Sequence, residues 1–122
     1  MTTTATEPIS AVSVVNMLGE IVDGHEEFVD PVCAYYVEGH PQCIVGHVLA
    51  AYGYDEDWFT ERAGSFTMQI PRLVNEFRLP FSAQAVRLLE AAQAEQDSGE
   101  CWGRAYRAAL VEMDAMRESE TP

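Results

Sequence analysis

Apolar residues recur at helical spacing in several separate stretches of the chain, and each stretch is bounded by residues that favour helix ends. The first covers residues 11–23, where Ser10 supplies an N-cap. The clearest covers residues 83–96, where Ser82 supplies another. This pattern predicts amphipathic helices, each of which buries one face in a shared core.

Four further helices are predicted from the same periodicity. They span residues 41–52, 55–62, 67–77 and 103–116. Pro41 suits the first turn of the helix that it opens, because its missing N–H would be unpaired there anyway. The helix over 41–52 has a broad apolar face with small residues opposite, so we expect it at the centre of the domain. In the last helix, Arg104 and Arg107 are expected to face outward. The predicted core consists of Ile44, Val48, Leu49, Leu88, Leu89, Trp102, Tyr106 and Leu110.

Short runs of aromatic and β-branched residues over 28–37 predict a small hairpin or isolated strand pieces. The expected fold class is therefore mainly α: a compact single-domain bundle of four to six helices with a short β element near 28–37. A chain of 122 residues that is 48% hydrophobic can fill one core. We expect residues 1–8 to be disordered, 9–117 to form the domain and 118–122 to be a frayed tail.

Charge divides the chain into two unlike halves. The first 61 residues hold eleven carboxylates and neither lysine nor arginine, whereas the rest hold seven arginines against nine carboxylates, for a net charge of −13. Affinity for nucleic-acid phosphate depends largely on basic residues, so direct nucleic-acid binding is not expected. The acidic half instead favours a basic protein surface as the partner, with carboxylates in the place of nucleic-acid phosphates.

Aromatic residues accompany the acids around the predicted helix 55–62, a combination common at protein interfaces. Packing of the two halves on one another, or a homodimer, would neutralise the same charge within the protein's own assembly. High net charge also serves solubility alone. The predicted interaction residues are Asp55, Glu56, Asp57, Trp58 and Glu61.

The densest set of metal-ligating residue types consists of Cys33, His40, Cys43 and His47. Zinc prefers thiolate and imidazole ligands, and Cys43 and His47 lie four residues apart on one predicted helix. The overall spacing differs from the common finger and ribbon patterns, so buried structural cysteines are the competing interpretation. A small zinc-binding structural module therefore remains an alternative function, and no other cofactor is expected.

Cys43 also occupies the third position of the predicted helix 41–52, where the helix dipole lowers a thiol pKa. With His40 or His47 as a base, this arrangement would suit a cysteine hydrolase. The surrounding carboxylates act in the opposite direction, because they raise the pKa of the thiol. The sequence therefore favours a protein that is not an enzyme and leaves the hydrolase as a remote alternative.

A polar cluster follows the apolar stripe of helix 83–96. Gln93 and Gln96 continue that stripe, so their amides must find partners inside the protein. We expect a structural clamp, in which the amides satisfy backbone groups of the turn 97–102 and Asp97 caps the last helix. A ligand pocket beside Trp102 is the alternative.

Two strings of residues are distinctive: Cys33-x-Tyr35-Tyr36-Val37-x-Gly39-x-Pro41-x-Cys43-Ile44-Val45-Gly46, and Gln93-x-x-Gln96-Asp97-x-Gly99-x-x-Trp102-Gly103-x-Ala105. Through them the chain resembles small uncharacterised helical proteins encoded by actinobacteria and by their phages, over most of its length. The resemblance implies a compact helical domain and brings no established activity. For a phage source, the expected partner would be a basic host protein that the chain modulates.

The expected location is the cytoplasm. No apolar run approaches the ~18 residues of a membrane span, and the Thr-rich N-terminus lacks the basic region of a secretory signal. The three cysteines form no disulfide framework, so we expect reduced thiols.

Overall fold

Helices carry the fold in the computed structural model, which describes residues 8–29, 36–37, 40–41, 43–63 and 69–120. The prediction of a mainly α fold is confirmed. The α-helices within these ranges are α1 (Ala11–Val22), α2 (Ile44–Ala51), α3 (Glu56–Trp58), α4 (Ile70–Phe77), α5 (Ala83–Asp97) and α6 (Trp102–Glu120), and a π-helical turn, η1 (Phe59–Ala63), directly follows α3.

Side-chain caps fix the starts of the two helices that the sequence marks most clearly. The Ser10 hydroxyl accepts a hydrogen bond from the Ser13 N–H (3.1 Å) at the start of α1. The Ser82 hydroxyl accepts one from the Ala85 N–H (3.0 Å) at the start of α5. Both caps were predicted, because each depends only on residues three positions apart.

The start of α2 was predicted wrongly. Pro41 belongs to a two-residue strand, β2 (His40–Pro41), which pairs antiparallel with β1 (Tyr36–Val37). A residue before proline is held in extended conformation, so His40 favours a strand here over a helical turn. The β element expected over 28–37 is not shown as such: only its last two residues pair, and residues 30–35 lie outside the described ranges.

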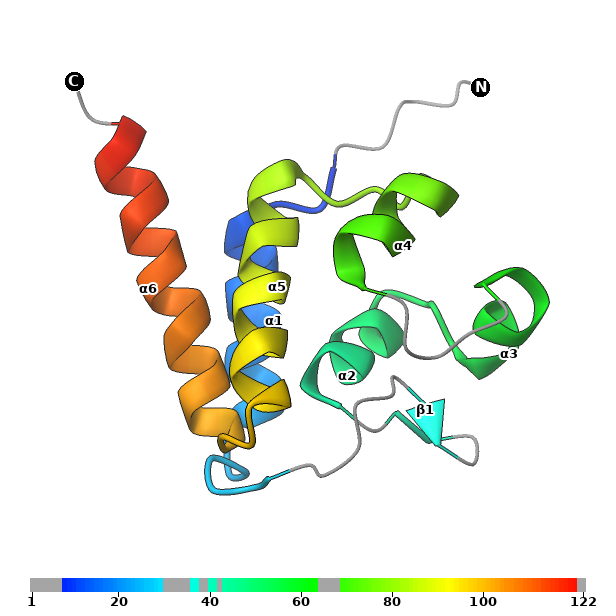
Figure 1. Cartoon of the computed structure of the whole chain (residues 1–122), viewed down its shortest axis with the longest axis horizontal. Coiled ribbons are helices and arrows are strands. Elements are labelled where there is room, and N and C mark those ends of the chain that lie inside the picture. Colours follow the sequence, from blue (N-terminus) through cyan, green and yellow to red (C-terminus); the bar gives the residue numbers. More distant parts are fainter. Residues whose placement is uncertain (1–7, 30–35, 38–39, 42, 64–68, 121–122) are drawn as a thin grey trace.

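Helix α5, not α2, lies at the centre of the molecule. It contacts α1, α2, α4 and α6, whereas α2 contacts α1, α5 and β2. Figure 1 shows α6 at one end of the longest axis and α3 at the other, with α1 and α5 between them. The sequence placed 41–52 at the centre because that stretch is the most uniformly apolar, but the longer α5 has room for more neighbours.

The core agrees with the prediction except at two positions of α6. Tyr106 is only partly buried, and Leu110 is 36% exposed. Ala109 takes the inward position, and each residue turns a helix by about 100°, so the next side chain points away from the core. Helix α6 also continues to Glu120, past the start of the expected frayed tail. The buried side chains of α6 are Trp102, Ala105, Ala109 and Met116.

The chain just before α1 is tied to the loop between α4 and α5. The Ile9 N–H donates to the Pro80 carbonyl (2.5 Å), and the Ser82 N–H donates to the Ile9 carbonyl (2.9 Å). Residues 1–7 of the segment expected to be disordered lie outside the described ranges. None of the helices in the described part of the chain is both long enough and apolar enough to cross a bilayer.

Candidate functional site

The α3–η1 segment carries the predicted interaction residues on a short, well-capped turn. Asp55 is the N-cap of α3, and its carboxylate accepts a hydrogen bond from the Trp58 N–H (2.9 Å). Asp57 and Glu61 are exposed, whereas Glu56 is half-buried. We call these five residues, Asp55, Glu56, Asp57, Trp58 and Glu61, the acidic surface.

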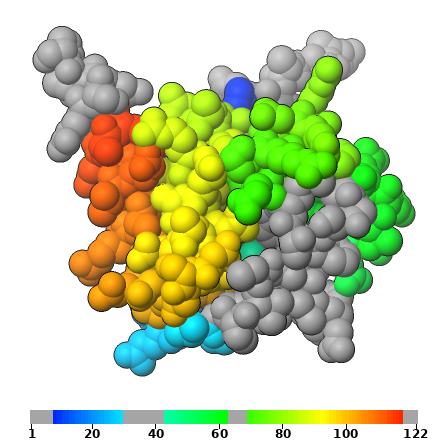
Figure 2. Space-filling view, in the orientation of Figure 1, coloured from blue at the N-terminus to red at the C-terminus, as the bar shows by residue number. Residues whose placement is uncertain are grey.

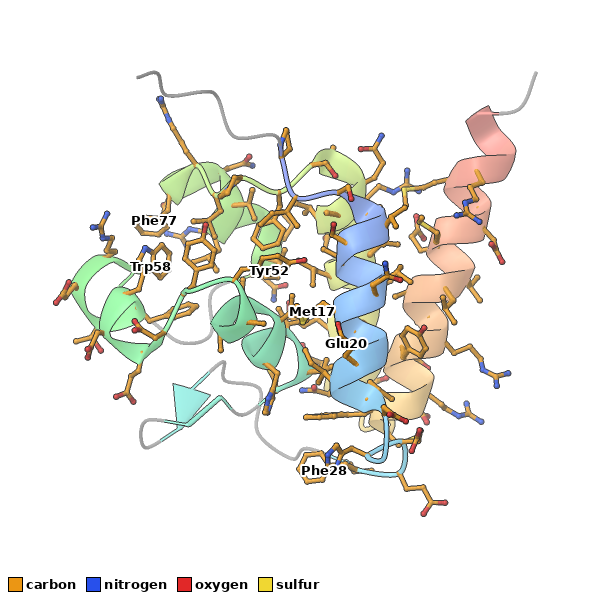
Figure 3. The ribbon with its side chains drawn as sticks, turned by 180° about the vertical axis from the view of Figure 1, so that it is seen from behind. Met17, Glu20, Phe28, Tyr52, Trp58 and Phe77 are labelled. Atoms are coloured by element: carbon orange, nitrogen blue, oxygen red, sulfur yellow. The ribbon has the colours of Figure 1, made fainter. Side chains whose placement is uncertain are left out.

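Aromatic side chains pack between the acidic surface and the core. The Trp58 ring makes edge contacts with Phe59, Tyr54 and Phe77, with ring centroids 5.0, 5.1 and 5.5 Å apart. Phe59 is fully buried, so it anchors Trp58 to the core. Trp58 and Phe77 lie next to one another in Figure 3. This aromatic packing joins the α3–η1 segment, which carries the carboxylates, to the bundle.

The same aromatic region perturbs two tyrosine hydroxyls. Burial raises the pKa of Tyr54 above its ordinary value of 10.0. Burial, and then the negative charge of Glu20, raise the pKa of Tyr52 in the same direction. The Tyr52 ring also packs edge-on against Phe81, with centroids 5.7 Å apart, so α2 is joined to the loop before α5.

Three arginines of the second half pair with acids outside the acidic surface. Three ion pairs join Arg72 to Glu76, Arg104 to Glu100, and Arg87 to Glu112, and all six residues belong to the second half. Arg62 directly follows the acidic surface in the sequence and is exposed. These three pairs therefore do not provide the alternative raised from the sequence, in which the two halves neutralise one another.

The structure describes only some of the predicted zinc ligands. Cys33 lies outside the described residues, and only the backbone of His40 is described. Within the described ranges, no three His, Cys, Asp or Glu side chains are grouped as a metal site requires. His47 packs its ring edge-on against Trp102, with centroids 5.2 Å apart.

Cys43 is the N-cap of α2 and not its third residue. Its sulfur accepts a hydrogen bond from the Gly46 N–H (3.2 Å), and only 2% of the residue is exposed. The thiol therefore performs the capping role that serine performs at α1 and α5. A capping sulfur at this depth offers no surface nucleophile, which is the feature that the hydrolase hypothesis requires.

Gln96 does form a structural clamp, but with a partner far away in the sequence. Its side-chain oxygen accepts a hydrogen bond from the backbone N–H of Ile44 (2.7 Å), in the first turn of α2. For Gln96, the predicted partner in the turn 97–102 was therefore wrong. Asp97 is exposed at the end of α5, and the Cys101 carbonyl accepts the first backbone bonds of α6.

Trp102 is the centre of a second aromatic group. Its ring makes edge contacts with Phe28, His47 and His25, with centroids 4.9, 5.2 and 6.4 Å apart. The residue is 4% exposed, and its indole N–H has no hydrogen-bond partner among the residues that the structure describes. The rings pack directly on the indole, so the interpretation as a structural element agrees with these contacts better than a ligand pocket does.

A broad groove, which the sequence did not predict, lies between α1 and α6. It is open to solvent and has a volume of about 1400 Å³, and its lining includes acids from α1 and the following loop, among them Glu20 and Asp23, together with Arg104 and Arg107 of α6. Two glycines mark where α6 approaches its neighbours. A Cβ at Gly19 would lie 3.0 Å from the Tyr106 hydroxyl, and one at Gly103 would lie 3.0 Å from the Glu26 carbonyl.

These features rest on the chain itself, because no protein-family model, no curated protein and no solved structure matches it.

Proposed function

We propose that this chain is a non-enzymatic interaction module whose acidic surface docks on a basic surface of another protein. One observation carries the proposal: three arginines of the second half, Arg72, Arg87 and Arg104, pair with acids of that same half, and the acidic surface keeps exposed carboxylates at Asp57 and Glu61. Carboxylates fixed beside an aromatic ring complement arginine side chains, which pair with carboxylates and stack on aromatic faces.

The partner class follows from the chemistry of this surface. Basic protein surfaces commonly bind nucleic-acid phosphate, and a fixed set of carboxylates presents negative charge of the same kind. The proposed partner is therefore a nucleic-acid-binding protein, such as a host protein met by a phage-encoded modulator. If the acidic surface imitates phosphate, the module and DNA should compete for one site on that partner.

The test compares two double variants with equal net charge. Asp57→Asn with Glu61→Gln removes two charges from the acidic surface, and Glu90→Gln with Asp97→Asn removes two exposed charges from α5. An arginine-rich peptide is the first probe, and a protein captured by the immobilised chain is the second. We expect the first double variant to bind about ten-fold more weakly and the control to match the natural chain.

Salt and competition complete the experiment. Binding should weaken steadily as salt is raised, because exposed charges are screened within about 10 Å at 0.1 M. Duplex DNA should displace the module from a captured protein. Equal loss in both double variants would show that net charge and not the acidic surface is responsible, and binding that ignores salt would rule out the electrostatic basis.

A further inference from the structure

The outer side of α6 carries positive and negative charges in an order that would match those of a second, antiparallel copy of the same helix. Helix α6 buries one stripe against α5 and α1 and leaves the opposite stripe in solvent. Residues spaced three and four apart lie on one side of a helix. We call the exposed stripe that contains Arg104, Arg107, Val111 and Asp114 the α6 outer face; its residues Arg104, Arg107 and Val111 also form the rim of the groove next to α1.

The centre of the α6 outer face is apolar. Val111 is the middle residue of the 19 in α6 and is 63% exposed, the highest value among the exposed large hydrophobic side chains of the described part. Leu110 beside it is 36% exposed. A single exposed valine is ordinary on a protein surface, so the valine alone identifies nothing. The charges on either side of it are what indicate an occupant.

Opposite charges flank Val111 at nearly equal distances. Arg107 lies four residues before it and Asp114 lies three residues after it. Both side chains are exposed, and neither has an ion-pair partner within the described ranges, whereas Arg104, Arg87 and Arg72 each do. The α6 outer face therefore offers one free cation and one free anion on the two sides of an apolar centre.

Two-fold symmetry turns this pattern into a complementary contact. In a symmetric dimer the same patch meets itself, so each residue must suit its symmetry partner. Two antiparallel copies of α6 centred on Val111 place Arg107 of each copy opposite Asp114 of the other. A parallel pair would instead place Arg107 against Arg107 and Asp114 against Asp114, which repel.

We infer that the α6 outer face binds the same face of a second copy of this chain, with the two helices antiparallel and Val111 at the two-fold axis. A 19-residue helix is about 28 Å long, so the contact is small for a protein interface and we expect micromolar affinity. The net charge of −13 on each copy opposes association, so the dimer should form at physiological salt more readily than at very low salt.

Because α3 lies at the far end of the longest axis from α6, the dimer leaves both acidic surfaces accessible (Figures 1 and 2). The inference is therefore independent of the proposed function, and either can fail without the other.

Charge reversal tests the dimer directly. Sedimentation equilibrium over a micromolar concentration series should show a monomer–dimer equilibrium for the natural chain. Arg107→Glu and Asp114→Arg should each weaken it by about ten-fold, since each creates two like-charge contacts. The two changes move the net charge in opposite directions, so a general charge effect cannot weaken both. The double variant Arg107→Glu with Asp114→Arg restores both pairs and should restore the dimer.

A cysteine at the axis tests the geometry. Under mild oxidation Val111→Cys should form a disulfide-linked dimer faster than Gln84→Cys, which places a cysteine at an exposed position of α5. Circular dichroism would show that each variant is folded. A natural chain that stays monomeric throughout the concentration series, a double variant no better than either single one, or equal cross-linking at the two cysteines would each overturn the inference.

Discussion

Gln96 is the only buried polar side chain among the residues that the structure describes, and it holds the first turn of α2. Gln96→Leu should lower the free energy of unfolding by about 1–3 kcal/mol, because the buried N–H of Ile44 would lose its partner. Urea unfolding measures the change. Gln84→Leu is the matched control, since it makes the same substitution at an exposed position of α5 and should change stability by less than about 0.5 kcal/mol.

The sequence predicted single residues well where their partners are local. Ser10 and Ser82 each cap a helix through a residue three positions later, a spacing that can be read directly from the chain. Gln96 was predicted to clamp something, since an amide on an apolar stripe needs a partner. Its partner, Ile44, lies 52 residues away, and nothing in local spacing encodes a distance of that kind.

Two glycines lie where α6 contacts its neighbours, Gly103 in α6 itself and Gly19 in α1. Substitution by alanine should change stability in opposite directions at these two positions. Gly103→Ala should destabilise the protein by about 1 kcal/mol or more, because the new Cβ would press on the Glu26 backbone carbonyl, which accepts a hydrogen bond from Gly103 itself (2.8 Å). Gly19→Ala should be neutral or stabilising, because the Tyr106 hydroxyl can move and alanine favours helix by about 1 kcal/mol. Thermal unfolding of both variants checks this pair.

An equal loss of stability in both alanine variants would contradict this explanation, which rests on the new Cβ meeting a rigid backbone carbonyl at Gly103 and a movable side chain at Gly19.

At the scale of elements, the sequence predicted the helices with strong caps and clear periods and missed what tertiary packing decides. Pro41 suited the start of a helix by local rules, yet it belongs to β2, and α2 begins at Ile44. Leu110 was assigned to the core because it lies at the edge of the apolar stripe, but only Ala109 beside it is buried, and Leu110 is 36% exposed. The groove between α1 and α6 exists only once these helices are packed together.

At the scale of the whole molecule, tyrosines contribute to the response to alkali above pH 10, where the chain has no lysine to titrate. The folded protein raises the pKa of Tyr52 and Tyr54 above the ordinary value of 10.0, so it binds their protons more tightly than the unfolded chain does. Their contribution to stability is complete below about pH 10 and is lost as the pH rises through the raised values. Unfolding free energies should therefore fall above pH 10, and less steeply in Tyr52→Phe with Tyr54→Phe.

An identical slope in the natural chain and the double phenylalanine variant would contradict the assignment to these two tyrosines.

The division of charge was visible in the sequence, but its consequence was not. Eleven acids without a cation in the first half could have been matched by the seven arginines that follow. The structure pairs Arg72, Arg87 and Arg104 within the second half. Those pairs depend on which helices are neighbours, so a net charge for each half could not reveal them.

The bond between Gln96 and Ile44 also bears on how the protein is made. A ribosome delivers α2 long before α5, so the first turn of α2 lacks its partner until residue 96 has been added. At the start of α6, the N–H groups of Trp102 and Gly103 likewise donate hydrogen bonds to the carbonyls of Phe28 and Glu26, which were synthesised much earlier. Both contacts join an early segment to a late one. These bonds of the first half can therefore form only after residues 96–103 have left the ribosome, so the early segments stay incompletely bonded until then.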